Sequence, residues 1–503
     1  MTALVPVPAS QTTDATAAPF TLTASTRLVA APSSHATAVL AAAALAPLIG
    51  RTLEIIDDLP ATGSDIVLEE VAEGGPEAYR LTASADGVRI AGGGQAGVFY
   101  GVQTLVQLVA ASATIQATVI DDAPRFAYRG VMLDVARHFF PLETVTGYID
   151  RAAALKFNAL HLHLTDDQGW RIELATHPEL TRTASATAIG GDPGGFFTKD
   201  DYARIIAHAA ARHMIVVPEV DGPGHTHAVG LSHPELVEAP VITEHITDVI
   251  EAYGGGMPQS GRPYTGLAVG FSSLRIHDEA TYAFLGDVYR ELAEMTPGPY
   301  LHVGGDEALG TDPADFAVFM SRATRMVTDL GKTPIAWHEA GAVADLSPDT
   351  IGQYWGYVAP ADGMDEKARA FTQRGSRVIL SPADAIYLDM KLDPDSPLGL
   401  TWADGPTSVR DSYAWEPAEL IHGIDERDIL GIEAPMWSET LRTAADLDSQ
   451  AFPRIASAAE IGWSPARHEQ RTWESFRSRV GGLAALWRRQ GIAFTRAAEI
   501  DWS

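Results

Sequence analysis

The sequence predicts an α/β protein, a (β/α)8 TIM barrel preceded by a small α+β domain, on three observations. The chain has 503 residues, more than one compact core usually accommodates, so two domains are expected. Beyond about residue 125, short apolar stretches alternate with amphipathic helical stretches, and eight of the apolar stretches have the length of strands. This alternation favours a closed parallel barrel, because no nucleotide-binding fingerprint follows any strand to support an open doubly wound sheet.

Residues 1–124 are expected to form the small domain. The stretches Tyr79–Ala83 and Gly87–Ala91 alternate between apolar and polar residues, which predicts a β-hairpin. Apolar residues at helical spacing over 98–109 predict a helix. The Ala-rich run over 36–49 predicts a second helix, which we take to be too short to span a membrane.

The polar break Asp121–Pro124 marks the expected domain boundary, so the barrel is assigned to residues 125–503. Helices are expected from about Leu142 to Lys156 and near Lys199–Arg212. The expected strands are Val131–Val135, Ala159–Thr165, Ile215–Val220, Tyr300–Gly304, Pro334–Trp337, Ile351–Trp355, Arg377–Leu380 and Gly431–Pro435.

Charge and composition restrict the partners. The chain carries 36 basic and 65 acidic side chains, a formal charge of -29, which disfavours nucleic acid and anionic membranes but not a neutral sugar. It has no cysteine, which excludes disulfides, thiolate nucleophiles and Cys-ligated zinc. No Lys or Arg precedes Arg27, so the basic start of a secretory signal is missing and a cytoplasmic location is expected, with export by another route left open. Nothing in the sequence indicates an oligomeric state.

Carboxylates and aromatic residues follow the expected strands. Catalytic groups of such barrels lie just after the carboxyl ends of the strands. Aromatic faces stack on sugar rings, while carboxylates and Arg bind hydroxyls, so the residue types predict a carbohydrate site. The residues at these positions are Asp134, Arg137, Asp166, Glu219, Asp221, His225, Asp306, Glu307, Trp337, Trp355, Tyr387, Asp389, Trp437 and Glu439.

The Asp306-Glu307 pair could simply cap the next helix. That helix has its own start signal in Asp312-Pro313, with Pro at the expected first position. The pair is therefore not needed as a helix cap. Gly305, which precedes it, allows a ligand to approach the backbone closely. We favour catalysis over capping.

Two other features have competing interpretations. His161 and His163 form an H-x-H pair that could bind a metal ion, but His225 and His302 add no strict ligand spacing, so polar packing inside the barrel is favoured. Three tryptophans without a strand-end position are assigned to core or loop packing: Trp170, Trp402 and Trp463.

Four long motifs resemble, in the same order, those of family-20 glycoside hydrolases, the β-N-acetylhexosaminidases. They are Arg129–Phe140, His161–Arg171, Pro218–His225 and His302–Glu307. The resemblance covers nearly the whole chain, including a small domain before the barrel. It implies a retaining exo-β-N-acetylhexosaminidase that releases terminal β-linked GlcNAc or GalNAc without a cofactor.

The resemblance also implies catalytic roles. Glu307 would be the general acid and base, and Asp306 would hold the nitrogen of the substrate's acetamido group. Tyr387 would donate a hydrogen bond to the acetamido carbonyl oxygen, which attacks the anomeric carbon and forms an oxazolinium intermediate. The neighbouring anion is expected to raise the pKa of Glu307. The acetyl methyl group would be enclosed by Trp337, Trp355 and Trp437.

The other residues to which the resemblance assigns a role would bind or flank the sugar. Arg137 and Glu439 would hold ring hydroxyls, with Asp389 assisting at the outer ones. Asp166 and His225 would flank Glu307 and tune it. Two alternatives stay open: a metal-dependent barrel hydrolase using the two strand histidines and the active-site aspartate, or a non-catalytic sugar-binding protein.

One stretch departs from the family pattern. Residues 237–262, in the loop after the third strand, are additional and include Gly254–Gly256. They are expected to lie on the rim of the site as a mobile loop. We therefore expect these residues to affect which aglycone is preferred, and not the reaction at the glycosidic bond.

Overall fold

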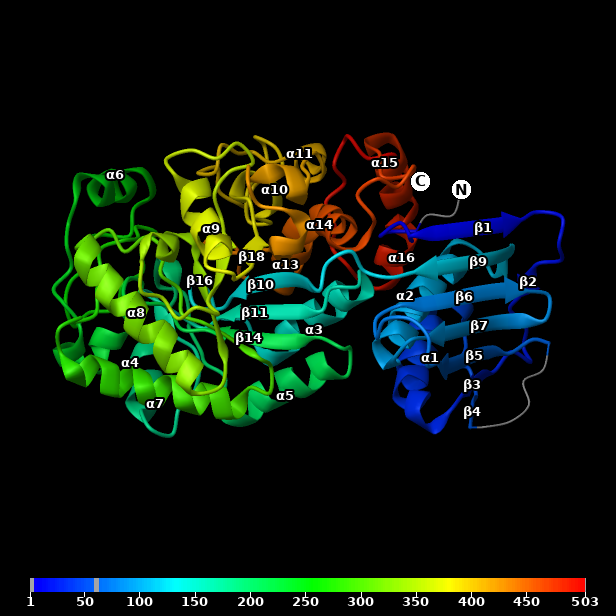
Figure 1. Ribbon diagram of the computed structural model, residues 1–503, viewed down its shortest axis with the longest axis horizontal. Helices are drawn as coiled ribbons and strands as arrows, with labels where there is room; N and C mark the ends of the chain where they lie inside the picture. The colour runs from blue at the N-terminus through cyan, green and yellow to red at the C-terminus, as the bar shows by residue number, and fades with distance from the viewer. Residues whose placement is uncertain (1–3, 58–62, 503) are drawn as a thin grey trace.

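The computed structural model describes residues 4–57 and 63–502, in which eight parallel strands close into a barrel beside an open sheet (Figure 1). The barrel closes because the first strand pairs with the last. The expected fold class, a TIM barrel preceded by a small α+β domain, is confirmed. The strands are β10 (Tyr128–Asp134), β11 (Ala159–His163), β14 (Ile215–Glu219), β15 (Tyr300–His302), β16 (Thr333–Trp337), β17 (Ile351–Tyr354), β18 (Val378–Leu380) and β19 (Ile429–Ala434).

The strand bounds differ from those expected by a few residues, for local reasons. β15 ends before Gly304 because Gly304 and Gly305 have φ of +70° and +103°, which extended backbone does not allow. After β11 the chain turns into a small hairpin of β12 (Thr165–Asp166) and β13 (Gly169–Trp170). All of β10 is buried, including the charged residues Arg129 and Asp134 on either side of its apolar centre, as expected for a strand covered on both sides.

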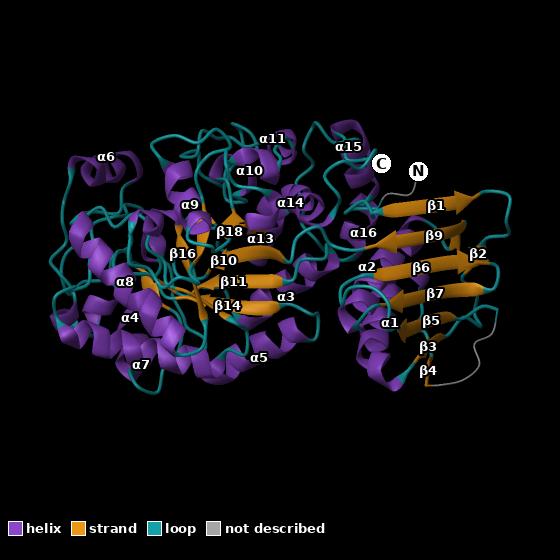
Figure 2. Cartoon of the chain, viewed as in Figure 1, coloured by secondary structure: helices purple, strands orange, loops and turns teal. Residues whose placement is uncertain are grey.

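Helices surround the barrel (Figure 2). α5 (Lys199–Ala210) begins at a capping box of Thr198 and Asp201, and α8 (Pro313–Asp329) begins at the predicted cap, Asp312. β16 and β17 are joined by a short 3-10 turn, η5 (His338–Ala342), in place of an α-helix. The other helices of the barrel domain are α3 (Leu142–Ala154), α4 (Pro178–Ala184), α6 (Glu244–Tyr253), α7 (Glu279–Met295), α9 (Met364–Gln373), α10 (Ala383–Ile386), α11 (Val409–Tyr413), α12 (Pro417–Leu420), α13 (Ala444–Ala451), α14 (Arg454–Trp463), α15 (Trp473–Gly482) and α16 (Ala484–Arg489).

The α6 segment (residues 237–262) is not a plain loop, contrary to the expectation. It contains α6, whose first turn is capped by the Thr243 hydroxyl. Ile246 of this helix is buried in a small apolar cluster with Tyr264 and Phe271. The segment therefore has a helix and packing partners of its own at the rim of the barrel.

The small domain is a seven-stranded sheet in the order β1-β9-β6-β7-β5-β3-β4. The predicted hairpin is confirmed as β6 and β7, and both predicted helices are present. α2 is buried along most of its length because it packs on the sheet and also contacts α16 of the barrel domain. The elements are β1 (Ser10–Asp14), β3 (Leu28–Ala30), β4 (Ile55–Asp57), β5 (Ile66–Glu70), β6 (Tyr79–Ser84), β7 (Gly87–Gly92), β9 (Ala117–Asp122), α1 (His35–Ile49) and α2 (Gln95–Ala111), with β2 (Phe20–Thr21) pairing β8 (Thr114–Ile115) at the side.

The turn η1 (Pro32–Ser34) and α1 together form an 18-residue helical stretch with a mean hydropathy of 1.3. By length and composition this stretch could cross a membrane, so the expectation that it is too short was wrong. Ala38, Ala41 and Leu45 on this helix are buried in the domain core. The stretch is 33% buried, so one face of it packs against the domain core.

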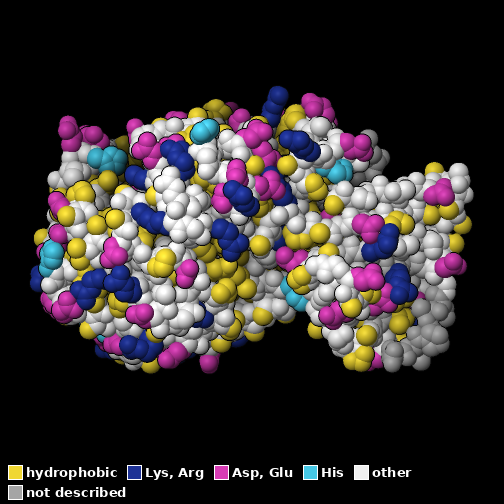
Figure 3. Space-filling view, viewed as in Figure 1, with side chains coloured by type: hydrophobic (Ala, Val, Ile, Leu, Met, Phe, Trp, Pro, Cys, Tyr) yellow, Lys and Arg dark blue, Asp and Glu magenta, His cyan; other side chains and the backbone are white. Residues whose placement is uncertain are grey.

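The two domains are joined by buried polar contacts. The ammonium of Lys156, at the end of α3, lies 2.9 Å from both Asp122 Oδ2 and the Tyr79 hydroxyl. The Trp463 indole donates to the same carboxylate, at 3.0 Å. On the face in Figure 3, acidic side chains are scattered over both domains and do not gather at one site.

Candidate active site

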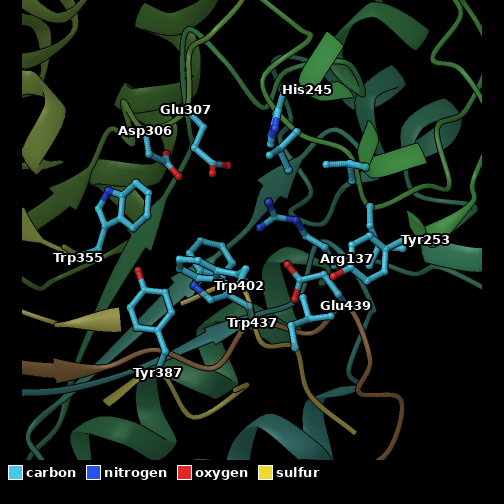
Figure 4. A pocket seen from close by; sticks show the side chains of 14 residues that line it. Arg137, His245, Tyr253, Asp306, Glu307, Trp355, Tyr387, Trp402, Trp437 and Glu439 are labelled. Atoms are coloured by element: carbon cyan, nitrogen blue, oxygen red, sulfur yellow. The ribbon is translucent and has the colours of Figure 1, made fainter. Parts of the chain in front are cut away.

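A cavity of about 270 Å³ lies at the carboxyl ends of the barrel strands (Figure 4). Ligand pockets usually measure about 300–1,000 Å³, so this one is suited to a single small group such as one sugar ring. Seven of the predicted site residues line it: Arg137, Asp306, Glu307, Trp355, Tyr387, Trp437 and Glu439. The cavity is also lined by His245, Val249, Tyr253, Leu267, Val269, Leu400 and Trp402.

The backbone after β15 is built to present the acidic pair. A Cβ atom on Gly304 would lie 1.6 Å from Asp221 Oδ1, so no larger residue fits there. The same carboxylate oxygen accepts a hydrogen bond from the Gly305 amide at 2.9 Å. Glu307 itself has φ of +45°, a strained value for a non-glycine residue. Such strain is typical of functional positions, which supports the catalytic interpretation of the pair.

His225 connects the acidic pair to the barrel interior. Its Nε2 atom lies 3.6 Å from Glu307 Oε2 and 3.7 Å from Asp306 Oδ2. Its Nδ1 atom lies 3.2 Å from Asp166 Oδ1. Burial opposes protonation, but Asp166 and Asp306 raise the pKa of His225 well above its usual value. The structure therefore brings the two predicted flanking residues to the acidic pair, with an imidazolium between carboxylates.

Glu307 has the protonation behaviour of a general acid. Its side chain remains 34% exposed, but into a cavity walled by protein, and burial raises its pKa to about 7. Asp306 contributes to this rise, while the positive charge of His225 opposes it. The direction agrees with the prediction, although burial and not the neighbouring anion is the largest cause.

Arg137 and Glu439 lie together on the side of the cavity away from Trp355 (Figure 4). The Arg137 guanidinium is held by Asp166 at 2.8 Å and lies over the Trp437 ring, 4.7 Å from its centroid. Burial raises the pKa of Glu439 to about 7, while Arg137 lowers it. A fixed guanidinium beside a carboxyl group is suited to holding vicinal hydroxyls of a sugar.

Aromatic rings enclose the opposite side. The Tyr387 hydroxyl points into the cavity on the side of Asp306 and Trp355 (Figure 4). Burial, with Asp389 and Asp306, raises the pKa of Tyr387 well above its usual value, so it stays a hydrogen-bond donor. Trp355 is fixed by a 3.0 Å hydrogen bond from its indole to Glu339. This side of the cavity therefore offers a donor and apolar walls together.

Four predicted residues do not line the cavity: Asp166 and His225, which are described above, and Trp337 and Asp389. Trp337 is fully buried, with its ring centroid 6.1 Å from that of Trp437, and its indole donates to Glu219 at 2.9 Å. Asp389 is also buried and accepts a long hydrogen bond of 3.4 Å from the Trp437 amide. Both residues lie behind Trp437 and support the wall that it forms.

The barrel histidines take part in a buried carboxylate network. His161 lies 2.8 Å from Glu433 and 3.1 Å from Glu219, and His163 contacts Glu219 and Asp166. Despite burial, these carboxylates raise the pKa of His161 to about 10. Among the described residues, four groups at the barrel have metal-ligand spacing, and none of them contains His161, His163 and Asp306 together. They are His161, Glu219 and His302; His163, Glu219 and Asp221; Asp166, Asp167 and His225; and Asp221, His225 and Asp306. The ligand set of the metal-dependent alternative is not brought together.

Sequence reasoning missed several residues of the site. Trp402, assigned to packing, is 43% exposed and lines the cavity, its ring centroid 5.6 Å from that of Tyr387. The assignment of Trp170 and Trp463 to the core is confirmed. Glu339, two residues beyond β16, could have been found by the same strand-end rule, and burial, with Asp306, raises its pKa to about 8.

A parallel barrel whose strand ends hold a protonatable glutamate beside an aspartate, with aromatic walls around them, defines a carbohydrate-cleaving barrel enzyme. The chain belongs to glycosyl hydrolase family 20. Residues 126–466 match the catalytic domain of that family, and residues 1–123 match its domain 2.

The three similar proteins described next belong to the same class of enzyme. The chain is 40% identical to a β-N-acetylhexosaminidase of Cellulomonas fimi, covering 99% of this chain and 97% of that one. A solved family-20 β-N-acetylglucosaminidase is 55% identical over the full length of both chains, with a TM-score of 0.91. A β-hexosaminidase variant of Streptomyces plicatus, solved in complex with the product GlcNAc, is 39% identical, with a TM-score of 0.89, and covers 100% of this chain and 98% of that one.

Proposed function

We propose that the protein removes terminal β-linked N-acetylhexosamine residues with retention, using the acetamido group of the substrate as the nucleophile. Its class is that of the β-N-acetylhexosaminidases, a glycoside hydrolase class to which its relatives belong. The proposal adds the stereochemistry, the intermediate and the role of each side chain. The small cavity supports removal of one terminal sugar at a time.

The observation that carries the proposal is the joint placement of Glu307, Asp306 and Tyr387 around one cavity. A carboxyl group with a pKa of about 7 is available to protonate the departing glycosidic oxygen. Asp306 is adjacent and suited to accept a hydrogen bond from the acetamido N–H. The Tyr387 hydroxyl is suited to donate to the acetamido oxygen.

The reaction proceeds in two steps. The acetamido carbonyl oxygen attacks the anomeric carbon while Glu307 gives its proton to the leaving oxygen, which breaks the glycosidic bond. The positive charge of the resulting oxazolinium is stabilised by the Asp306 carboxylate. Water then attacks the anomeric carbon, the bond between that carbon and the acetamido oxygen breaks, and the water gives a proton to Glu307, which restores the enzyme and the acetamido group. Two displacements at one carbon give net retention.

The direct test is turnover of aryl β-GlcNAc, aryl β-GalNAc and chitooligosaccharides, with NMR detection of the first anomer released. The proposal predicts the β-anomer at early times. The α-anomer as first product would contradict retention, and sugar binding without turnover of any substrate would favour a non-catalytic protein. Turnover that EDTA abolishes and zinc restores would favour the metal-dependent alternative.

A further inference from the structure

The tetrapeptide His-Pro-Glu-Leu occurs twice in the chain, at 177–180 and 233–236. Each copy forms a short turn in which Pro is the first helical residue and His precedes it, in α4 and in η4 (Pro234–Leu236). His177 has φ, ψ of -137°, 63° and His233 has -127°, 67°, so the two histidines share one backbone conformation. The fold brings these twin turns together, with the two imidazole centroids 5.2 Å apart.

Glu179 lies between the two imidazoles. Its Oε1 atom is 3.0 Å from His233 Nε2 and 3.6 Å from His177 Nδ1. One nitrogen of each ring and one carboxylate oxygen all lie within 4.8 Å of one another. Ligand atoms about 2.0–2.1 Å from a tetrahedral zinc ion are about 3.3 Å apart, so these separations are close to those of a zinc site.

One nitrogen of each ring is left without a hydrogen bond. The Nε2 atoms of His177 and His233 are buried, yet neither has a hydrogen-bond partner within the described structure. Glu179 is close enough to His233, but its direction is not that of a hydrogen bond. A buried ring nitrogen without a protein partner is available to coordinate an ion. The imidazole side chains are 17% and 14% exposed, so an ion can reach them from solvent.

The surroundings favour a cation and fix the rings. Glu235 lies 3.5 Å from His233 Nδ1, and Asp287 of α7 lies 3.6 Å from His177 Nε2. Carboxylates next to metal-binding imidazoles orient the rings and make them more basic. Phe284 packs against both imidazoles at centroid distances of 4.9 and 5.3 Å. The cluster thus has two nitrogen ligands, one oxygen ligand and further acidic groups.

We propose that His177, Glu179 and His233 form a divalent-cation site suited to Zn²⁺, separate from the active site. Water completes the tetrahedral shell. The ion ties α4, which follows β11, to η4, which follows β14. Because η4 leads directly into the α6 segment, the ion holds in place the base of the element that carries His245 and Tyr253 to the cavity. Its role is structural, so it does not depend on the proposed reaction.

The test uses the full chain after dialysis against a chelator. Titration with Zn²⁺ is followed by calorimetry and by thermal unfolding, and Co²⁺ is added separately to record the visible bands of tetrahedral cobalt. We expect one ion per chain at this site, a Tm that rises with Zn²⁺ concentration, and affinity that falls below about pH 6.5 as histidine is protonated.

Two variants locate the ion. Glu179→Gln and His233→Gln should each weaken binding at least tenfold and remove the Zn²⁺-dependent rise in Tm. His277→Gln is the matched control, because His277 is an exposed imidazole paired with Asp315 at 2.8 Å outside the cluster. Turnover of aryl glycosides should persist in all three. No Zn²⁺ binding by the parent chain, or unchanged binding in either cluster variant, would overturn the proposal. If one variant does not fold, the other decides.

Discussion

The imidazole of His225 lies 3.6 Å from the carboxyl group of Glu307 and is also held by Asp166 at 3.2 Å. Asp166 keeps His225 charged, and that charge lowers the pKa of Glu307 against the raising effect of burial. The balance leaves the Glu307 pKa at about 7. The general acid is therefore tuned by a residue from the loop that follows a different barrel strand, β14.

The first prediction concerns pH. Glu307 must be protonated to act as the acid, so kcat/KM should be full below pH 7 and fall as pH rises through about 7. His225→Asn removes a positive charge that favours the ionised form of Glu307. The basic limb of the profile should then move to higher pH, by about one unit or more. Asn tolerates the φ of +56° at this position. An unmoved limb, or one displaced to lower pH, would count against the tuning role.

The second prediction concerns the leaving group. Glu307→Gln removes the transferable proton and keeps the shape of the side chain. Loss of general acid catalysis costs about 10²–10⁴-fold, so kcat/KM for chitooligosaccharides should fall by that order. Aryl glycosides with acidic phenols should lose less because their leaving groups need little protonation. Parallel Brønsted plots for the parent and the variant over a series of phenols would refute the assignment.

The third prediction concerns the α6 segment. Tyr253 is 55% exposed and lines the cavity together with Trp402, so it is placed to stack on a sugar beyond the cleaved bond. Tyr253→Ala should lower kcat/KM for chitooligosaccharides by about 2–10-fold, as expected for one aromatic contact. Aryl GlcNAc should be unaffected. Met257→Ala is the control, because Met257 is exposed in the same segment but does not line the cavity. An equal loss for both substrates would argue against an aglycone role.

The fourth prediction concerns the domain junction. Burial lowers the pKa of Lys156, and Asp122 at 2.9 Å opposes this. Asp122→Ala leaves a buried ammonium without its partner and should reduce the free energy of unfolding by about 3–5 kcal/mol. The double variant Asp122→Leu/Lys156→Met should recover part of this loss, because no buried charge then remains. Urea unfolding measures both. A loss below about 1 kcal/mol for the single variant would show that the pair is not needed at the junction.

Much of the site could be predicted from the sequence. The local pattern of apolar residues shows where a buried strand ends, and the site residues follow such ends. Asp306 and Glu307 directly follow β15, and Arg137 follows β10, so their side chains meet on one rim of the barrel. Trp337 shows the limit of the rule. It ends β16, but strand residues alternate in direction, and its side chain is packed behind Trp437 and not in the cavity.

Residues from long connections could not be placed in this way. Trp402 lies in the extended connection between β18 and β19, and only the tertiary fold brings its ring to Tyr387. The α6 helix did have a signal, because Ile246, Val249, Ile250 and Tyr253 are at helical spacing. The glycines that follow the helix led to its interpretation as a loop.

The fifth prediction concerns Asp306 and the acetamido group, the central claim of the account. Asp306→Asn should reduce kcat by about 10²–10³-fold, because a neutral amide stabilises the developing oxazolinium charge less than a carboxylate does. The same variant should bind a GlcNAc-thiazoline, which resembles the oxazolinium, more weakly than the parent does. Unchanged thiazoline affinity would show that Asp306 does not interact with the acetamido group.

The most direct measurement is kcat/KM for aryl β-glycosides whose N-acyl group carries none, one, two or three fluorine atoms. Fluorine withdraws electrons from the acyl carbonyl and makes its oxygen a poorer nucleophile, while the leaving group and Glu307 stay the same. If that oxygen attacks the anomeric carbon, kcat/KM should fall steeply with each fluorine. If a protein side chain attacks instead, kcat/KM should be nearly independent of fluorination, which would contradict the account.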